Sequence, residues 1–286
     1  MDGIVIVDKP QDWTSQDVVA KLRGVFQTRR LGHGGTLDPM ATGVLPVFVG
    51  RATRGVEFFE HAEKTYETVM RLGITTDTED ITGEVLEEKE VNITEVQFLA
   101  VLENFRGEIQ QIPPMYSAIK INGQKLCDLA RKGREVERQP RTITIHRLEC
   151  LEFTGLTARL LVHCSKGTYI RTLCKDIGEA LGCGGCMESL RRVTAGEYTI
   201  EKAVPLRTLI ESEDPGQYLL PVDSMFMAYP AVELTAKQEK CCRNGVAFTC
   251  NLEEGTYRVY DPKGEFLALS HMVEGKLTTI KSFWAV

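Results

Sequence analysis

The sequence has no apolar run that approaches the roughly 20 residues of a membrane-spanning helix, so it predicts no membrane association. Its first ten residues, MDGIVIVDKP, place Asp2 where a secretory signal carries positive charge, and their apolar run ends at Asp8. We therefore expect a cytoplasmic protein. Histidine is also scarce. The five histidines are scattered over 286 positions, which argues against a metal cluster.

A regular cysteine framework is missing as well. The nine cysteines are an odd number, and several lie in apolar stretches, so they indicate small buried side chains of a reducing compartment. Cys183 and Cys186 have a spacing that suits zinc or redox chemistry. Zinc usually needs four ligands, and no second pair with such spacing follows. We therefore expect no metal.

Charge is distributed unevenly along the chain. Residues 77–90, DTEDITGEVLEEKE, carry a net charge of −6, so the remaining chain balances at 33 basic and 33 acidic residues. Residues 120–141, KINGQKLCDLARKGREVERQPR, carry seven basic and three acidic residues. Such a segment can be a solvated face, and it can equally bind a phosphate backbone. We call residues 120–141 the basic segment.

Strand and helix patterns alternate without a regular repeat, which favours an α+β fold over a doubly wound parallel sheet. Thr14, with Asp17 three residues later, predicts the start of one helix, and Thr94 predicts the start of another. The predicted strands of this part are 4–7, 66–73 and 158–164, and the predicted helices are 14–26, 94–105 and 172–181.

The last 60 or so residues indicate a small, mostly β module. Residues 212–224, SEDPGQYLLPVDS, are typical of a loop and predict a boundary between a domain at 1–224 and a module at 225–286. The module pattern predicts a short helix at 235–244 and strands at 255–260, 265–272 and 277–284, with a turn at 261–264.

One acid stands alone in GHGGTLDPMATGVLP, residues 32–46. Asp38 before Pro39 is typical of a turn. The glycines before it do not form a phosphate loop, because no lysine and threonine follow them. An aspartyl-phosphate enzyme usually carries a second acid where this chain has Met40. A nucleophilic or charge-stabilising carboxylate also remains open, and it needs a nearby cation.

Arg171 is a candidate for that cation. It lies two residues after Tyr169 in SKGTYIRTL, and in an extended segment the two side chains would point to the same side. A surface arginine and a core tyrosine explain the same pattern. Tyr66, in EKTYETV, is equally compatible with an ordinary strand tyrosine.

Taken together, these stretches resemble the TruB family of pseudouridine synthases, which isomerise uridine 55 in the T loop of tRNA. The resemblance covers about the first 195 residues in ordered blocks. The blocks are GHGGTLDPMATGVLP at 32–46, DKP at 8–10, KTY at 64–66, RLGITTDTEDITG at 71–83, FRGEIQQIPPMYSAIK at 105–120, CSKGTYIRTL at 164–173 and LRR at 190–192.

The resemblance implies a role for each matching residue. Asp38 is implied to be the catalytic aspartate, Arg171 its ion-pair partner and Tyr66 the ring that stacks on the target base. Tyr169 and Leu190 are implied to line the uracil pocket, and His33 to stack on the T loop. The implied fold is a mixed, largely antiparallel sheet flanked by helices, with a PUA-like module at the end that could reach the acceptor stem.

RNA binding is implied for an insertion at about 120–145 that the family uses as a thumb against tRNA. The candidate contacts are Lys120, Lys125, Arg131, Lys132, Arg134 and Arg141. The implied reaction is an isomerisation, so we expect no cofactor. We also expect a monomer with no obligate protein partner. Two other functions stay open, a tRNA-folding factor, alone or in addition to the enzyme, and a metal-dependent hydrolase, which Met40 and the scattered histidines disfavour.

Overall fold

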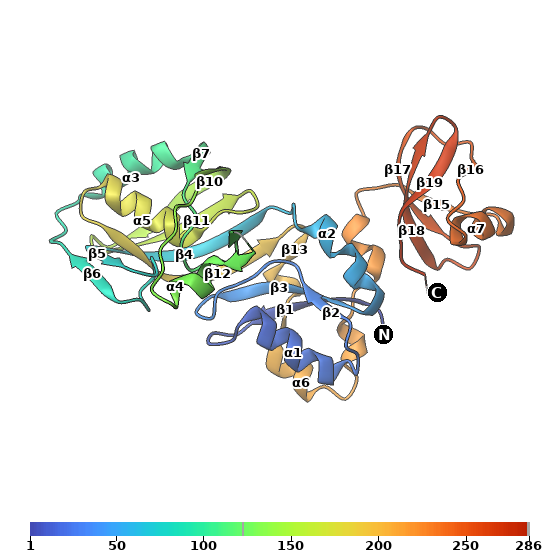
Figure 1. The fold of residues 1–286 in the computed structure, drawn as a ribbon, viewed down its shortest axis with the longest axis horizontal. Coiled ribbons are helices and arrows are strands. Elements are labelled where there is room, and N and C mark those ends of the chain that lie inside the picture. The colour runs from blue at the N-terminus through green and yellow to red at the C-terminus, as the bar shows by residue number, and fades with distance from the viewer. Residues whose placement is uncertain (122, 285–286) are drawn as a thin grey trace. The chain divides into compact units, whose positions relative to one another are not determined.

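The computed structural model describes residues 1–121 and 123–284 (Figure 1). The chain divides into two compact units. Unit 1 comprises Met1–Pro39, Leu45–Glu60 and Glu201–Val286, and unit 2 comprises Met40–Val44 and His61–Ile200. The chain therefore passes from unit 1 to unit 2 directly after Pro39. No helix within the described ranges is long and apolar enough to cross a membrane.

The first part of unit 1 is built on a buried strand, β1, which lies between β14 and β3. The Val and Ile side chains of β1 are almost completely buried, as the apolar run predicts. Helix α1 begins after Thr14, whose hydroxyl oxygen accepts a hydrogen bond from the N–H of Asp17 at 3.0 Å, so the predicted cap is confirmed. The elements are β1 (Gly3–Lys9), α1 (Ser15–Val25), β2 (Leu31–His33), β3 (Thr42–Val49), α2 (Val56–Phe59), β14 (Val204–Pro205) and α6 (Leu206–Glu211).

Unit 2 is built on a sheet in the order β12-β4-β11-β10-β7, in which every neighbouring pair is antiparallel. The first residues of β3 join it in parallel, because Thr42 pairs with Arg191 of β12. The sheet is thus mixed and largely antiparallel, as expected. Its strands are β4 (Lys64–Leu72), β7 (Gly107–Gln111), β10 (Arg141–Phe153), β11 (Thr157–Cys164), β12 (Gly185–Ala195) and β13 (Tyr198–Thr199), the last paired with β12.

Two helices pack on this sheet and against each other, α3 (Glu95–Leu102) over β10 and α5 (Ile170–Ala180) over β4 and β12 (Figure 1). The cap at Thr94 is confirmed, and Phe98 and Leu102 form the buried stripe. The smaller elements of unit 2 are β5 (Ile74–Thr76), β6 (Val85–Glu88), β8 (Lys120–Ile121), β9 (Gln124–Lys125) and α4 (Leu126–Ala130). The short 3-10 helices of the chain are Gly50–Gly55, Glu103–Phe105, Ile200–Lys202, Pro215–Tyr218 and Val222–Phe226.

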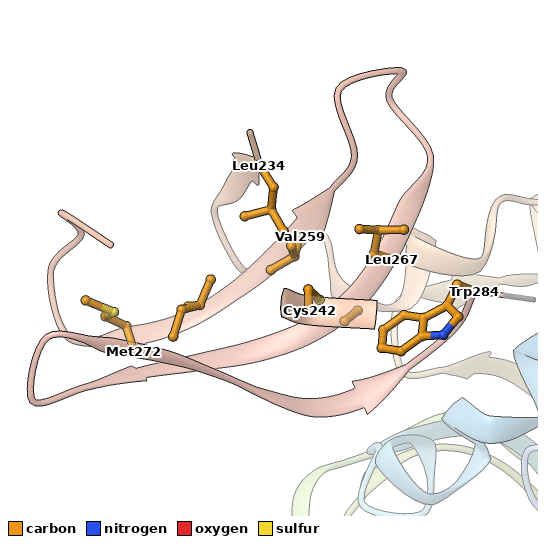
Figure 2. Packing of buried hydrophobic residues seen from close by; sticks show 8 residues of the cluster. Leu234, Cys242, Val259, Leu267, Met272 and Trp284 are labelled. Atoms are coloured by element: carbon orange, nitrogen blue, oxygen red, sulfur yellow. The ribbon is translucent and has the colours of Figure 1, made fainter. Parts of the chain in front are cut away.

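The last part of unit 1 is a separate five-stranded sheet in the order β15-β17-β18-β19-β16. Figure 2 shows its core, in which Leu234, Val259 and Leu267 lie with Trp284 and with Cys242 of α7. The predicted turn is present, since Asp261 Oδ1 accepts from the N–H groups of Lys263 and Glu265 at 2.9 and 2.8 Å. The elements are β15 (Ala231–Glu233), α7 (Ala236–Arg243), β16 (Phe248–Thr249), β17 (Gly255–Tyr260), β18 (Phe266–Val273) and β19 (Lys276–Ser282).

The predicted boundary at residue 224 stays a prediction. The five-stranded sheet lies within the predicted module at 225–286, whose last two residues lie outside the described part of the chain.

Candidate active site

Asp38 lies on a loop of unit 1 that is held from both sides. On one side, Ser15 Oγ donates to the carbonyl oxygen of Leu37 at 3.0 Å and accepts from the Leu37 N–H at 2.8 Å. Ser15 is buried in the first turn of α1, and Leu37 is also buried. The backbone that enters Asp38 is therefore fixed by two hydrogen bonds to one hydroxyl group.

The residue after Asp38 is held in the same way. Lys9 is fully buried, and its Nζ donates to the carbonyl oxygen of Pro39 at 3.2 Å. The N–H of Asp12 donates to the same oxygen at 2.8 Å. Asp38 itself is half-buried. Its backbone is thus clamped at both neighbouring residues, which is the preorganisation that a catalytic carboxylate requires. The role of Ser15 is not predictable from the sequence, because a serine after a helix cap is common.

His33 ends β2, where it pairs with Val47 of β3, and its side chain is half-buried. The loop then continues through Gly34, at which a Cβ atom would lie 2.5 Å from the ring of Phe59. Any larger residue would collide there, so the glycine is needed for the close approach of this loop. Both ends of the motif at 32–46 lie in strands, and only the turn at Asp38 and Pro39 between them was predicted from the sequence.

Tyr66 lies in unit 2 on β4, between β11 and β12. It pairs with Val162 on one side and with Arg192 on the other. Burial alternates along β4, so Lys64 and Tyr66 lie on its buried face, and Tyr66 is 9% exposed. The side chain of Tyr66 is hydrogen-bonded to the side chain of Arg192, which lowers the cost of burying that guanidinium.

Arg171 lies in the first turn of α5 and is almost completely buried. Its Nη1 donates to the carbonyl oxygen of Thr78 at 3.0 Å, and its Nη2 donates to that of Tyr116 at 2.8 Å. Its Nε is 3.9 Å from Asp80 Oδ2. The guanidinium plane is therefore oriented by two carbonyls and one buried carboxylate. The pairing with Asp38 stays a prediction.

Two acidic residues near the start of the stretch at 77–90 are buried, which was not predicted from the sequence. Glu79 and Asp80 are buried. Glu79 Oε2 accepts from the hydroxyl of Thr172 at 2.6 Å, and its Oε1 is 3.4 Å from Lys175 Nζ. The loop therefore contacts polar side chains in the first turns of α5, 93 to 96 residues away in the sequence.

Tyr169 caps the N-terminal end of α5, and Arg171 belongs to the helix itself, so the expected extended segment is wrong here. Ile170, Leu173 and Ile177 recur at helical spacing and are buried. The buried face of the helix thus begins at Ile170, and Arg171 lies within the helix. Gln111 of β7 fixes Tyr169 by a pair of hydrogen bonds. Its Nε2 donates to the Tyr169 carbonyl at 3.0 Å, and its Oε1 accepts from the Tyr169 N–H at 2.8 Å.

Leu190 lies on β12 opposite Thr68 of β4, two residues along each strand from the Arg192 and Tyr66 pair. It is 8% exposed. Within unit 2, the sheet thus places Leu190, Tyr66 and Arg192 on two neighbouring strands. Arg192 and Gln111 were not predicted as site residues, since neither residue type suggests such a role without the strand register.

The predicted RNA contacts all lie at the surface. Each of Lys120, Lys125, Arg131, Lys132, Arg134 and Arg141 is exposed to solvent. The basic segment contains the β8 and β9 hairpin and α4, and its Asn122 lies outside the described residues. Exposed lysine and arginine side chains on short elements are suited to contact a phosphate backbone.

The two cysteines of the CGGC stretch are buried, and burial raises the pKa of both thiols, that of Cys186 to about 11. Thiols with raised pKa values are poor nucleophiles and poor ligands at neutral pH. Within the described part of the chain, no group of three or more histidine, cysteine or acidic side chains could hold a metal ion.

Two solved structures resemble the whole chain. A chain of an H/ACA RNP bound to a substrate RNA containing 2'-deoxyuridine has a TM-score of 0.74 at 25% identity, and the match covers 99% of this chain and 85% of that chain. A chain of a Cbf5-Nop10-Gar1 complex also has a TM-score of 0.74, at 28% identity and with the same coverage. The fold is that of the pseudouridine synthases.

Sequence comparison identifies the family. The TruB family pseudouridylate synthase (N terminal domain) matches residues 23–170, and the tRNA pseudouridylate synthase B C-terminal domain matches residues 171–227. The tRNA pseudouridine synthase B of Pseudomonas fluorescens strain Pf0-1 is 44% identical over 282 residues, 96% of this chain and 92% of the relative. That of Clostridium kluyveri is 39% identical over 289 residues, 99% of this chain and 100% of the relative. The chain belongs to the TruB family of pseudouridylate synthases and is an isomerase.

Proposed function

We propose that this enzyme converts uridine 55 in the T loop of tRNA to pseudouridine, with Asp38 as the essential carboxylate. The observation that carries the proposal is the Asp38 loop, whose backbone is clamped at Leu37 and at Pro39 in a chain of this family. Relatives named tRNA pseudouridine synthase B support tRNA as the substrate. A cytoplasmic location and a monomeric state are part of the proposal.

The reaction explains the need for such a loop. The bond from the sugar C1′ to uracil N1 breaks, the base turns, and a new bond joins C1′ to C5. The proton on C5 is lost and N1 gains one, so substrate and product are isomers. Asp38 attacks C1′ or C6, or it stabilises the charge of a glycal route. In each case its carboxylate must stay in one place while the detached base turns.

Tyr66 is proposed to stack on the target uracil after the nucleotide has left the T loop. Extruding a base costs a few kcal/mol of unstacking, and stacking on an aromatic ring offsets roughly 1 to 3 kcal/mol of it. A ring held on a central strand is suited to this role because its position does not depend on a loop. Tyr169 and Leu190 are proposed to line the uracil site, and His33 to stack on the rearranged T loop.

Arg171 is proposed to be the ion-pair partner of Asp38. Its guanidinium is buried and is oriented by the carbonyl oxygens of Thr78 and Tyr116. A buried cation of fixed direction favours the charged form of a carboxylate beside it. These two hydrogen bonds orient the guanidinium group without the substrate. The proposed ion pair would therefore not have to form anew in each turnover.

The basic segment is proposed to act as a thumb on the tRNA, and the C-terminal module is proposed to reach the acceptor stem. All six candidate side chains of the segment are exposed. A-form RNA is read mainly through its shape and backbone, and its loop bases are read once they are splayed out. A locally basic surface can therefore bind RNA although the whole chain carries a net charge of −6.

An Asp38→Asn variant tests the proposal. The asparagine keeps the size of the side chain and loses its charge, so conversion of an unmodified T stem-loop transcript should stop while tRNA binding persists. Glu213→Gln is the matched control, because it removes one exposed carboxylate from the same unit. An inactive wild-type protein contradicts the proposed reaction, and continued turnover by Asp38→Asn contradicts the proposed role of the aspartate.

A further inference from the structure

Arg192 is a fully buried cation on β12. It is 1% exposed, and burial lowers the pKa of its guanidinium. Burial of a guanidinium group is costly unless hydrogen bonds compensate the lost hydration. Arg191, the preceding residue, is only partly buried and its Nη1 donates to the hydroxyl of Thr42 at 3.3 Å. The two neighbouring arginines therefore differ in environment, and the buried one calls for a specific explanation.

The partners of Arg192 lie on both neighbouring strands. Its Nε donates to the carbonyl oxygen of Val44 on β3 at 2.7 Å, and its side chain is hydrogen-bonded to that of Tyr66 on β4. The register places it opposite Gly43 on one side and opposite Tyr66 on the other. One planar group thus connects the side chain of Tyr66 with Val44 of β3, which lies six residues after Asp38 in the chain.

Close packing keeps this connection rigid. Gly43 has a φ of +100°, and a Cβ at this position would lie 2.2 Å from the carbonyl oxygen of Arg192. The backbones of β3 and β12 can approach this closely only because residue 43 is a glycine. The carbonyl of Val44 and the guanidinium of Arg192 are therefore held at a fixed separation by the sheet itself.

The chemistry of arginine determines what this contact does to Tyr66. A guanidinium group only donates hydrogen bonds, so the phenolic oxygen of Tyr66 accepts from it. The O–H group of the tyrosine must then point away from Arg192. The positive charge also stabilises negative charge on the phenolic oxygen. In a glycal route, a base has to take the C2′ proton. The phenolate form of Tyr66, after loss of its own proton to solvent, is suited to that task because its oxygen lies beside a buried cation.

We propose that Arg192 is a positioning residue for Tyr66, holding its phenolic oxygen through a guanidinium that is anchored on the Val44 carbonyl. This inference rests on the proposed function, because Tyr66 is the ring assigned to the target base. Arg192 does not touch the substrate in this scheme. It acts through the oxygen of Tyr66, so its contribution depends on that oxygen being present.

A double-mutant cycle with Arg192→Lys and Tyr66→Phe tests this dependence. Misplacement of a reacting group by about 1 Å costs on the order of 100-fold in rate, so Arg192→Lys should lower kcat about 10- to 100-fold, with KM within about threefold of wild type. In the Tyr66→Phe background the same change should lower kcat by less than about threefold. Arg159→Gln, an exposed arginine on β11, is the control and should leave kcat unchanged.

The outcomes separate positioning from stability. Equal losses from Arg192→Lys in both backgrounds would overturn the proposal, because a merely structural arginine does not depend on the tyrosine oxygen. A large change in KM alone would overturn it as well. Arg192→Gln, which lacks the charge, should lose more activity than Arg192→Lys, and the reverse order contradicts the proposal.

A second measurement needs no arginine variant and covers the case in which those proteins do not fold. In protein with 15N-labelled arginine, the Arg192 side-chain Nε resonance should shift in Tyr66→Phe and stay in place in Tyr218→Phe. An unmoved resonance in Tyr66→Phe overturns the contact. This measurement does not depend on turnover. An inactive wild-type enzyme would refute the proposed function, whereas the contact between Arg192 and Tyr66 is tested by the 15N spectrum alone.

Discussion

Lys64 is a buried lysine on the face of β4 that also carries Tyr66, and its replacement by methionine tests the electrostatics of that face. Lys64 is 9% exposed, and its Nζ donates to the carbonyl oxygen of Ala62. Burial, with a smaller contribution from the charge of Arg192, lowers the pKa of Lys64 from 10.5 to about 8. The charged form is therefore less favourable in the folded protein than in the unfolded chain.

The sign of the effect follows from proton binding. Between pH 8 and 10.5 the unfolded chain binds more protons at this lysine than the folded protein, so the free energy of unfolding rises with pH in that window. One pKa unit corresponds to about 1.4 kcal/mol, so the full rise from this group is about 3 kcal/mol. The loss of the hydrogen bond to Ala62 costs about 1 to 2 kcal/mol. At pH 7, Lys64→Met should therefore be more stable than wild type by about 1 to 2 kcal/mol.

Urea unfolding of both proteins at several pH values from 7 to 10.5 is the assay. The advantage of Lys64→Met should shrink as the pH rises and should reverse above about pH 10, where only the lost hydrogen bond remains. Lys276→Met, which removes an exposed lysine of β19, is the control and should show no such trend. A difference in unfolding free energy between Lys64→Met and wild type that is constant from pH 7 to 10.5 would show that the pKa of Lys64 is not lowered in the folded protein.

Four further predictions follow from single features. Gly43→Ala should lower the free energy of unfolding by more than about 3 kcal/mol in urea unfolding, since its Cβ would collide with the Arg192 carbonyl, and a loss below about 1 kcal/mol contradicts this. Burial raises the pKa of Asp176 to about 6, so Asp176→Asn should stabilise the protein by about 3 kcal/mol above pH 6, with the gain fading toward pH 4; an equal gain at pH 4 and 7 refutes it. Glutamine at the six exposed basic positions of the basic segment should weaken tRNA binding and reduce the slope of log K against log salt by up to about 4, whereas an unchanged slope removes the segment from the interface. Excess chelator should leave turnover unchanged, and loss of activity that zinc restores would reveal a metal requirement.

Local signals made several elements predictable from the sequence. The starts of α1 and α3 follow from Thr14 and Thr94, because a helix cap needs only a side chain and the N–H three residues later. The turn at Asp261 is also predictable, because the side chain of Asp261 accepts hydrogen bonds from N–H groups close by in the sequence. The order of the strands is not local. β12 contains two consecutive arginines and no alternating apolar pattern, so its burial comes from the elements that pack around it, chiefly β3, β4 and α5.

The candidate site was predictable as far as the motifs reach. The family resemblance assigns the candidate residues Asp38, Tyr66, Arg171 and Tyr169. It does not assign the side chains that hold them in place. The side chains that hold them come from distant parts of the sequence, as Ser15 does for the Asp38 loop. Gln111 and Arg192 depend on strand register, and a change of one residue in register would turn each side chain to the other face.

The role of Asp38 at uridine 55 is best tested by mass mapping of pseudouridine in an unmodified tRNA transcript that is incubated in parallel with wild-type and Asp38→Asn protein. We expect pseudouridine at position 55 with the wild-type protein alone and an unmodified transcript with Asp38→Asn, while both proteins bind the tRNA. Modification at other positions, no modification by the wild type, or continued modification by Asp38→Asn would contradict this expectation.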